Sequence, residues 1–557
     1  MTLPTVDVVV VGAGAAGGIV AEQLSLAGLH TVLLERGDKF GFSQTGHDEL
    51  RSQRITVLGN AFGPDDKHYV RLAQTSDGHF VRVRPSEGAY GNNAACVGGG
   101  TMSYGAMAWR YTEKDFRMRS TYGAPEASTL EDWPISYDDL EPFYSKAEWE
   151  IGVSGTMGAN PFEARRQKPY PMPALPLNTE ASALFKAAQG MGWHPFPIPM
   201  AINSVTYQKR SGCIQCPHCV GFACEVNAKN STAVTAIPRA LATAHCELRT
   251  NCITSRIVTN DAGKATGVEY FQGDHALTQP CRAVVVSCSA TESARLLLNS
   301  ATKLFPHGLG NNNDWVGRNL QGHAYAGAYG IVEKDLFDGL GPAARVACCD
   351  FSHGLPGGLK GGAMLSNEFI RLPYLFSRNA IPPGTPKWGL EHKQHMRHSY
   401  KRTVSVMGPV QEMPVFESRV EIAPEVKDAW GIPTLRISGH RHAADLEVAR
   451  FISARAEEWL KACGAIKTWP VLPGRGVSGG QHQAGTCRMG TDPQTSVVDR
   501  YCRIHDMDNL YVVDGSVHVT NGGFNPSLTI QAIAYWASAK ITGDLRGRSA
   551  PVLPLPA

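Results

Sequence analysis

The first 35 residues carry the pattern that most restricts how this chain can fold. A valine-rich run over residues 6–11 leads into a glycine-rich turn over residues 12–17, an amphipathic stretch that reaches Ala27, and a second apolar run over residues 31–34. Strand, glycine turn, helix and strand in this order are typical of a βαβ unit. The chain is therefore predicted to begin with an α/β domain that binds a dinucleotide.

The glycines of this unit have separate tasks in dinucleotide binding. Gly12 permits the tight turn, Gly14 lets a pyrophosphate approach the backbone, and Gly17 lets the helix pack closely on the strand. The helix N-terminus presents free N–H groups and the positive end of its dipole to the phosphates. A carboxylate closing the second strand accepts from a ribose hydroxyl and would repel the 2′-phosphate of NADP. The predicted cofactor contacts of the unit are Gly12, Gly14, Ala15, Ala16, Gly17 and Glu35.

Length and composition exclude several other classes of protein. A chain of 557 residues exceeds what one hydrophobic core needs, so two domains or one large elaborated domain are expected. With 43% hydrophobic and 18% charged residues, the composition is that of a soluble globular protein. The net charge of +3 is too small for a nucleic-acid binder. No apolar run approaches the ~20 residues of a membrane span, and we see no signal peptide.

The rest of the chain divides into regions that differ in composition and in hydrophobic periodicity. A second glycine loop runs from Val97 to Gly105, whereas residues 36–95 show no clear period. Further predicted elements are a helix that starts near residue 138, an extended proline-rich linker over 169–176, a buried strand over 283–288, a helix over 293–298, a strand over 509–513 and a helix over 526–541.

Apolar and polar residues alternate at 419–422 and 434–438, which indicates a largely antiparallel sheet with one solvent-exposed face. A long amphipathic helix is predicted to follow over 444–463. We interpret the region from about 320 to 470 as a second, substrate-binding domain.

Four of the 14 cysteines crowd into twelve residues, at Cys213, Cys216, Cys219 and Cys224. Closely spaced loop cysteines are typical of iron–sulfur ligands. Structural zinc also prefers four thiolates, but usually in two separated pairs. Ordinary free or paired cysteines are the third interpretation, and the spacing alone leaves all three open.

Four separated motifs together resemble one known family. They are the glycine unit at 12–17, the pair Gly98-Gly99, the segment His482-Gln483-Ala484-Gly485-Thr486, and Asn525-Pro526. In this order and at these separations they resemble the glucose–methanol–choline (GMC) family of FAD-dependent oxidoreductases over essentially the whole chain. The segments 132–134, 168–173 and 316–320 resemble a branch of bacterial sugar and sugar-acid dehydrogenase flavoprotein subunits. That branch includes FAD-dependent glucose dehydrogenase, fructose dehydrogenase and gluconate 2-dehydrogenase.

The resemblance implies an architecture. FAD-binding segments are expected at 1–160, 211–318 and 471–557, and the substrate domain at 319–470, with a linker and a substrate-domain contribution at 161–210. The expected fold class is an FAD-binding Rossmann-like α/β domain of the GMC type, joined to a substrate domain built on a largely antiparallel sheet.

The resemblance also implies the roles of single residues. An alcohol that gives hydride to a flavin must lose its hydroxyl proton to a base, and a histidine suits this task because its pKa lies near working pH. His482 matches the family's catalytic histidine, and Asn525 is assigned the second hydrogen bond to the substrate oxygen. Further FAD contacts are expected at Gly98, Gly99, Ser103, Asp514, Gly515, Asn525 and Pro526.

Two positions depart from the family pattern. Relatives that attach FAD covalently often carry a histidine where this chain has Ser103, so FAD is expected to be held non-covalently. Ser289 stands where the family usually has a glycine after a strand, so the cofactor contact at this position departs from the family pattern.

The branch also implies an iron–sulfur cluster. Its members carry a three-iron cluster in this region, and the spacing of Cys213 and Cys219 matches two of its ligands. The next gap is one residue longer than expected and Cys216 is extra. We therefore favour a 3Fe-4S cluster on Cys213, Cys219 and Cys224, with a 4Fe-4S cluster on all four cysteines as the alternative.

The expected function is that of an FAD-dependent dehydrogenase that oxidises a hydroxyl of a sugar, sugar acid or glycoside and passes electrons through the cluster to a partner. Two alternatives stay open: an oxygen-using alcohol oxidase without a cluster, and a non-catalytic flavin electron carrier. The expected partners are a small chaperone-like subunit and a cytochrome c or other electron acceptor, with no nucleic acid. The expected location is the periplasm, with membrane association through partner subunits, or alternatively the cytoplasm.

Overall fold

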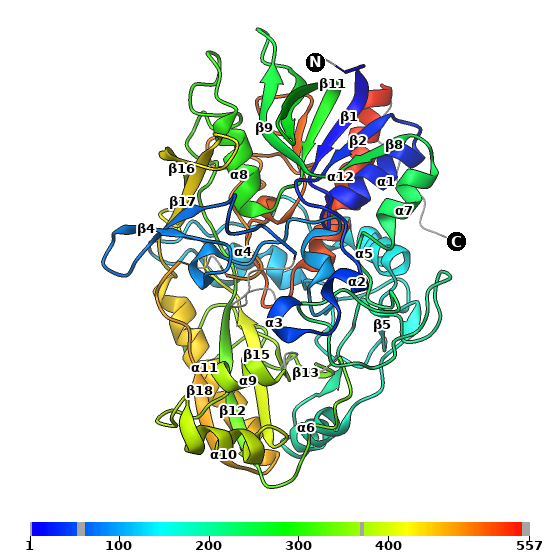
Figure 1. Ribbon diagram of the computed structural model, residues 1–557. Coiled ribbons are helices and arrows are strands. Elements are labelled where there is room, and N and C mark those ends of the chain that lie inside the picture. Colours follow the sequence, from blue (N-terminus) through cyan, green and yellow to red (C-terminus); the bar gives the residue numbers. More distant parts are fainter. Residues whose placement is uncertain (1–2, 53–61, 343, 368–371, 478–479, 548–557) are drawn as a thin grey trace.

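The computed structural model describes residues 3–52, 62–342, 344–367, 372–477 and 480–547. One end of the molecule holds a mixed sheet, in which strands from the start, middle and end of the chain lie side by side (Figure 1). The other end holds a second, antiparallel sheet with its own helices (Figure 1).

The mixed sheet is built on the predicted N-terminal strands. β1 (Val6–Val11) pairs in parallel with β2 (Thr31–Leu34) on one side and with the last residues of β11 (His275–Val286) on the other. The valines of β1 are buried along the strand, as expected where helices cover both faces of a parallel sheet. The strand order is β8 (Cys246–Arg249), β2, β1, β11, β10 (Ala265–Gln272), β9 (Cys252–Thr259), with β19 (Leu510–Val512) also paired in parallel with β11.

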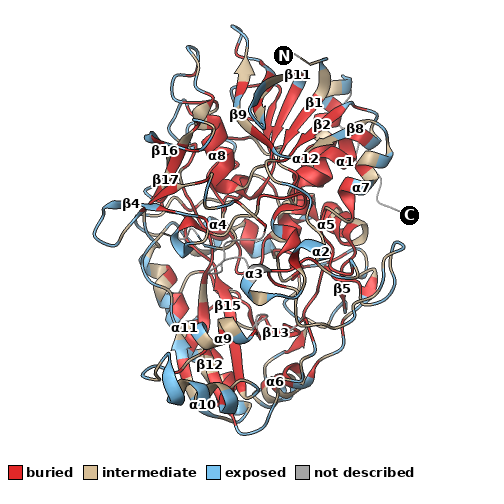
Figure 2. Ribbon diagram, in the orientation of Figure 1, coloured by how far each residue is buried: buried red, intermediate tan, exposed pale blue. Residues whose placement is uncertain are grey.

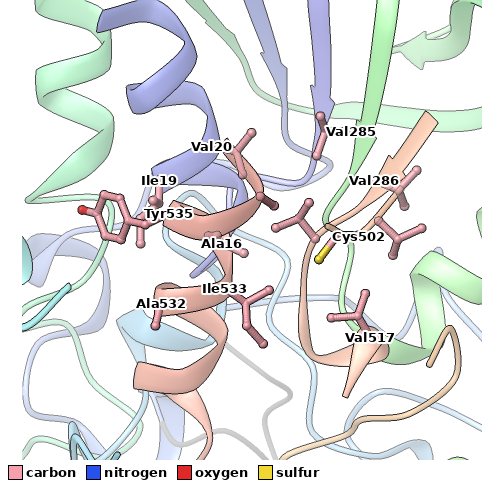
Figure 3. Close-up of a cluster of buried hydrophobic side chains, with 14 of the residues drawn as sticks. Ala16, Ile19, Val20, Val285, Val286, Cys502, Val517, Ala532, Ile533 and Tyr535 are labelled. Carbon is pink, nitrogen blue, oxygen red and sulfur yellow. The ribbon is translucent and has the colours of Figure 1, made fainter. Parts of the chain in front are cut away.

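Helices from both ends of the chain cover this sheet. α12 (Ser527–Arg546) packs against α1 (Gly17–Leu26) and α5 (Tyr137–Ile151), and α7 (Ala236–Ala242) packs on α1. Their apolar side chains meet those of β11 in a core that includes Ile19, Val286 and Ile533 (Figure 3). The start of the chain is therefore held in place by its end.

The antiparallel sheet has a core of its own. Its order is β18 (Ala465–Val471), β12 (Ala324–Val332), β15 (Thr403–Val410), β14 (Leu365–Asn367), β13 (Val346–Cys348), β7 (Phe196–Pro197). The long helix α11 (Ala443–Ala462) lies on β12 and β15 and also contacts α6 (Thr179–Gly190). Figure 2 shows these strands largely buried, whereas α10 (Gly389–Ser399) at the lower edge is mostly exposed.

One pair of predicted strands lies in a different sheet from the one expected. The hairpin of β16 (Arg419–Lys427) and β17 (Pro433–Ser438) forms as predicted, but β17 continues in parallel onto β3 (Arg71–Gln74), which pairs with β4 (Phe80–Val83). Alternation of apolar and polar residues indicates a half-buried strand but not the strand it pairs with. The partner of β17 is β3, which lies more than 350 residues earlier in the chain. The short strands β3 and β4 also explain why residues 36–95 show no period.

The other predicted elements agree with the structure. The helices expected at 293–298, 444–463 and 526–541 are α8 (Ala290–Asn299), α11 and α12. Within the linker, β6 (Met172–Pro173) forms a two-residue bridge with β5 (Ser154–Gly155). No helix in the described ranges combines the length and the apolar character needed to cross a bilayer. The remaining helices are α2 (Phe42–Thr45), α3 (Glu49–Ser52), α4 (Met118–Tyr122) and α9 (Pro373–Asn379).

Candidate active site

Two adjoining cavities run from the glycine turn to the predicted catalytic residues. The first, which we call the glycine-loop cavity, has a volume of about 250 Å³ and is lined by residues that include Gly14, Glu35 and Gly515. The second, the histidine cavity, has a volume of about 240 Å³ and is lined by residues that include His482 and Asn525. Ala15 and Ser289 belong to both walls, so the two cavities join into one elongated space.

The glycine turn has the geometry that dinucleotide binding needs. Gly12 has φ of +100°, and a Cβ there would lie 2.3 Å from the carbonyl oxygen of Ser287. A Cβ on Gly17 would lie 1.9 Å from the carbonyl oxygen of Gly12. A Cβ on Gly14, in contrast, would meet no atom within 4 Å, although the residue lines the cavity. Gly12 and Gly17 are therefore needed for packing, and Gly14 for the approach of a ligand.

Glu35 lies at the end of β2, as the sequence predicts. Its Oε2 accepts the N–H of Ala13 at 2.9 Å and its Oε1 accepts the N–H of Gly37 at 3.0 Å. Burial raises the pKa of this carboxyl, while the backbone donors oppose that rise. Each oxygen keeps a further lone pair, so a ribose hydroxyl can still donate to it.

The second glycine loop packs directly on the first. The N–H of Gly98 donates to the carbonyl oxygen of Ala13 at 2.8 Å, and a Cβ on Gly99 would lie 2.9 Å from Cα of Gly14. Gly98 and Gly17 line neither cavity, so they support the cofactor loop from behind. Ser103 lies on the wall of the histidine cavity.

Asp514 forms hydrogen bonds to the part of the glycine-loop cavity wall that contains Ser289, where the family usually has a glycine. Its carboxylate accepts the N–H of Ser289 at 3.0 Å and the hydroxyl of Ser293 at 2.6 Å. Ser289 has φ of +76°, which is rare for residues other than glycine. The backbone thus keeps a glycine-like conformation there, and the hydrogen bond from Asp514 helps to hold it. Gly515 completes this part of the glycine-loop cavity.

The amide of Asn525 is oriented by Trp109. The indole Nε1–H donates to Asn525 Oδ1 at 3.0 Å, and because an indole can only donate, Oδ1 must face it. The Nδ2 group therefore points the other way, 3.4 Å from His482 Nε2 and 3.3 Å from the hydroxyl oxygen of Tyr325. Pro526 follows on the cavity wall, and α12 begins at the next residue. His482 and Asn525, predicted separately from the sequence, are thus brought together.

His482 lies in a loop that is fixed to another segment of the chain. Gln321 and Ala484 form an antiparallel bridge, and the carbonyl oxygen of His482 accepts from Asn521 Nδ2 at 2.7 Å. His482 has φ of +58°, another left-handed residue at the centre of the site. The bridge also brings His323 against the ring of His482, with 2.7 Å between their Nδ1 atoms.

Sequence reasoning missed Trp109, His323 and Tyr325. Trp109 follows the second glycine loop and His323 follows the 316–320 segment, but nothing in their local pattern assigns them to a ring or amide far away in the chain. The only available signal for His323 was its position just after the Val316–Leu320 motif.

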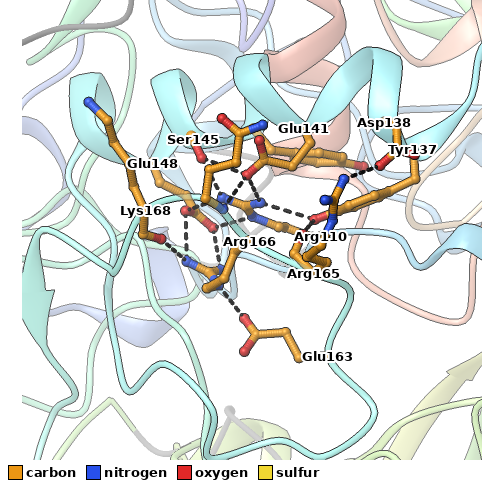
Figure 4. Close-up of polar contacts among 12 residues, drawn as sticks. Arg110, Tyr137, Asp138, Glu141, Ser145, Glu148, Glu163, Arg165, Arg166 and Lys168 are labelled. Carbon is orange, nitrogen blue, oxygen red and sulfur yellow. Dashed lines mark hydrogen bonds and ion pairs between the residues drawn. The ribbon is translucent and has the colours of Figure 1, made fainter.

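A buried ionic cluster holds the side chain of Arg110, the residue that follows Trp109 (Figure 4). Glu148 of α5 accepts two N–H groups from Arg110, at 2.9 and 2.7 Å, and two from Arg166, at 3.0 and 2.8 Å. Glu141 also pairs with Arg110, and Glu163 with Arg166. Burial alone would raise the pKa of Glu148, but the two guanidiniums outweigh it and hold this pKa below its ordinary value.

The four clustered cysteines line one small cavity of about 10 Å³. None of the four forms a disulfide bond. Cys219 lies close enough to the other three for their charges to raise its pKa. Burial raises the pKa of Cys219 to about 12, which Lys229 opposes. Cys216 also lies beside His47 and His218, the three offering ligand atoms within 4.8 Å of one another. Among the described residues, this mixed group is the one set of three possible ligands that lie so close together, and the structure does not show Cys213, Cys219 and Cys224 arranged as a clear metal site.

The cysteine loop also contacts the histidine cavity. Val220, the residue after Cys219, lines that cavity, and the N–H of Gly221 donates to the carbonyl oxygen of Ser103 at 2.8 Å. The cysteine loop thus forms part of the wall of the histidine cavity.

A dinucleotide cavity that ends at an oriented histidine–asparagine pair defines the chain as a nucleotide-cofactor oxidoreductase. Comparison with known proteins identifies the family of the chain. The GMC oxidoreductase family model for the N-terminal part matches residues 6–325, and the model for the C-terminal part matches residues 414–534. The chain belongs to the GMC oxidoreductase family.

Curated relatives align over nearly the full length. The chain is 29% identical to gluconate 2-dehydrogenase flavoprotein from Pantoea cypripedii, with 97% of this chain and 94% of that protein covered. It is 29% identical to paromamine 6'-oxidase from Streptomyces fradiae, with 97% and 92% covered. It is 27% identical to the fructose dehydrogenase large subunit from Gluconobacter japonicus, with 97% and 98% covered.

Among solved structures, pyridoxine 4-oxidase from Mesorbium loti has the same fold, with a TM-score of 0.64 at 17% identity over 96% of this chain and 99% of that one. The α/β domain with an added antiparallel sheet is therefore confirmed. FAD, the cofactor that the family implies, fits the elongated cavity, because Gly14 leaves open space where a Cβ would otherwise project.

Proposed function

We propose that this chain is an FAD-dependent dehydrogenase that oxidises a hydroxyl of a sugar, sugar acid or glycoside. The observation that carries this proposal is the pairing of His482 Nε2 with Asn525 Nδ2, 3.4 Å apart on the wall of the histidine cavity. The substrate class is supported by the relatives named gluconate 2-dehydrogenase and fructose dehydrogenase.

The pair can hold an alcohol oxygen in the orientation that oxidation needs. Asn525 Nδ2 donates a hydrogen bond to this oxygen, while His482 Nε2 accepts the proton of the same hydroxyl. The orientation of the amide is not free, because Trp109 holds Oδ1. When bound, FAD supplies the acceptor for the hydride that leaves the carbon. The residues that would hold it are the glycine turn, Glu35, Gly99, Asp514 and Gly515, and we propose that it is held non-covalently because Ser103 offers no imidazole for attachment.

We propose further that the cysteine loop holds an iron–sulfur cluster, with three irons on Cys213, Cys219 and Cys224 favoured over four irons that also use Cys216. A cluster at this place would supply one-electron transfer to an external acceptor. Two contacts of the cysteine loop support this proposal: Val220, the residue after Cys219, lines the histidine cavity, and the N–H of Gly221 donates to the carbonyl oxygen of Ser103 on the wall of that cavity.

The names of two relatives, a flavoprotein and a large subunit, support a chain that works with partner subunits. We propose a small chaperone-like subunit and a cytochrome c or other acceptor, with the complex on the periplasmic side of a membrane. Cell fractionation after co-expression with neighbouring genes would test this, and a fully cytoplasmic, partner-free enzyme would contradict it.

A second candidate function is an oxygen-using alcohol oxidase. The observation that favours it is the presence among the relatives of paromamine 6'-oxidase and 6'''-hydroxyparomomycin C oxidase from Streptomyces lividus, the latter 30% identical over 97% of this chain. Hydrogen peroxide formed in step with substrate oxidation would identify the oxidase.

The catalytic proposal is tested by mixing the purified holoenzyme anaerobically with gluconate, fructose, glucose and glycosides. We expect at least one of them to bleach the flavin absorbance. His482→Gln should keep its flavin and lose about 10²–10⁴-fold in the rate of bleaching. If no alcohol reduces the flavin, the chain is an electron carrier and the proposal fails.

The cluster proposal is tested by iron, sulfide and zinc analysis with EPR of anaerobically purified protein. We expect about three or four irons per chain, lost in Cys219→Ser and kept in Cys246→Ser, whose thiol lies on β8 outside the loop. Zinc without iron would instead indicate a site that uses Cys216 with His47 and His218.

A further inference from the structure

A buried histidine from a different part of the chain contacts the proposed base. His323 lies just before β12, and the edge of its ring faces the ring of His482 with the centroids 4.9 Å apart. The Nδ1 atoms of the two rings are 2.7 Å apart. The other ring nitrogen of His323, Nε2, is 2.6 Å from the backbone carbonyl oxygen of Gly522.

These contacts determine where the protons lie. A carbonyl oxygen can only accept, so His323 must carry a hydrogen on Nε2. Burial lowers the pKa of His323 to about 4, so near neutral pH the ring is neutral and has only this one hydrogen. Its Nδ1 is then a lone pair, and the 2.7 Å contact requires His482 to donate from Nδ1.

We propose that His323 is a positioning residue that sets the tautomer of His482. By accepting from Nδ1–H of His482, it leaves the lone pair of His482 on Nε2, the nitrogen that lies beside the Asn525 amide. This inference rests on the proposed function, in which His482 Nε2 takes the hydroxyl proton. An uncharged imidazole thus performs the orienting task that a carboxylate performs in many catalytic histidine pairs.

The surrounding groups are consistent with a neutral acceptor. Asp115 lies near His323, but its carboxylate pairs with His353 at 3.1 Å. Glu412 accepts the N–H of Gly322 at 3.1 Å rather than contacting the ring. Buried His518 on the far side has its pKa lowered to about 3 by burial and is neutral as well. When His482 takes the substrate proton, its Nδ1–H therefore stays in place, and only one nitrogen changes its protonation.

Two substitutions separate positioning from simple structural support. His323→Asn places an amide oxygen near the present Nδ1 and can still accept from His482, but it gives up the bond to Gly522. His323→Gln places an amide nitrogen near the present Nε2 and can still donate to Gly522, but it no longer offers an acceptor to His482. With equal flavin content, we expect flavin reduction by substrate to fall at least about 10-fold in His323→Gln and clearly less in His323→Asn. The reverse order would show that His323 only holds the Gly522 loop, and would overturn the proposal.

A spectroscopic measurement tests the tautomer without any turnover. Holoenzyme labelled with ¹⁵N-histidine is studied by long-range ¹⁵N–¹H correlation NMR, and the signals of His482 are identified as those lost in His482→Gln. We expect Nδ1 protonated and Nε2 unprotonated in the wild type, with this state kept in His323→Asn and lost in His323→Gln. A wild-type His482 protonated on Nε2 would refute the inference. If no alcohol reduces the wild-type flavin, the proposed function fails while this spectrum still decides the tautomer.

Discussion

Glu148→Gln removes the central charge of the buried ionic cluster formed with Arg110 and Arg166. The Glu148 carboxylate is fully buried and accepts four N–H groups, two from Arg110 and two from Arg166. Glutamine has the same shape but only one oxygen, and its NH₂ group would face guanidinium donors. Two buried arginine N–H groups would therefore lose their acceptor, and both guanidiniums would lose their shared counter-charge.

The size of the effect follows from burial. Breaking a buried ion pair by removing one partner costs about 3–5 kcal/mol. An unfolding entropy of about 2.1 cal/mol/K per residue over 557 residues gives about 1.2 kcal/mol/K, so a one-step transition would shift by about 3–4 °C. If the FAD-binding domain unfolds separately from the antiparallel sheet, fewer residues share the loss and the shift is larger.

The assay is thermal unfolding at pH 7, followed by the rise in flavin fluorescence as the cofactor is released. Glu163→Gln is the matched control, because Glu163 has one arginine partner among the described residues, Arg166, and its side chain is partly exposed; its other contact, the hydroxyl of Tyr170, can still donate to a glutamine oxygen. We expect the control to shift by less than half as much as Glu148→Gln. Equal shifts, or a Glu148→Gln transition within 1 °C of wild type, would refute the reasoning.

The same variant has a defined pH dependence. Because the pKa of Glu148 is lowered in the folded protein, its contribution to stability is fully present above the ordinary glutamate pKa of about 4.3 and is lost as the pH falls through the folded value. The difference in melting temperature between wild type and Glu148→Gln should therefore be constant from pH 6 to pH 8 and should shrink progressively as the pH falls below about 4.3. A difference that shrinks already between pH 6 and pH 5 would contradict this assignment.

Three further substitutions test the cofactor loop and the active site. Gly14→Val should fold normally but purify without flavin, since its side chain meets only open cavity, and flavin in the purified variant would contradict the assignment. Gly12→Ala should instead lower the yield of soluble protein, because its Cβ would lie 2.3 Å from a carbonyl oxygen at φ of +100°; a normal yield and melting temperature would show that this turn relaxes. Trp109→Phe removes the donor that orients Asn525, so flavin reduction in stopped flow should slow by about 2–10-fold at unchanged flavin content. An unchanged rate would mean that the amide is oriented by its other contacts.

The sequence predicts features that lie within one short segment better than contacts between distant segments. The turn at residues 12–17 lies between the strand and the helix that it joins, so the tasks of its glycines can be assigned from the local pattern alone. His482 and Asn525 could be proposed because each stands in a short segment that matches the family. The Asp514 bond to Ser289 could not be predicted, since it joins residues 225 positions apart.

The same limit explains the misplaced hairpin and the missed residues. The alternation of β16 and β17 is a property of each strand, whereas their sheet is decided by β3, which the sequence did not reveal. Trp109 and Asn525 are 416 residues apart, and their contact depends on how the two chain segments meet. A single tryptophan or histidine is not part of a repeating sequence pattern, so the sequence does not indicate which distant residue it contacts.

The pairing of β19 with β11, and of α12 with α1, has a consequence for how the protein is made. The end of β11 is synthesised 224 residues before the start of β19 (510 − 286), which at about 5–20 residues per second corresponds to roughly 11–45 s. During that time the edge of β11 that later pairs with β19 has no neighbour, and exposed edges of this kind invite wrong pairing. The nascent chain therefore cannot close its flavin pocket until translation is almost complete. Loading of the cofactor is accordingly a post-translational event, and a cell short of flavin would accumulate full-length chains rather than stalled fragments.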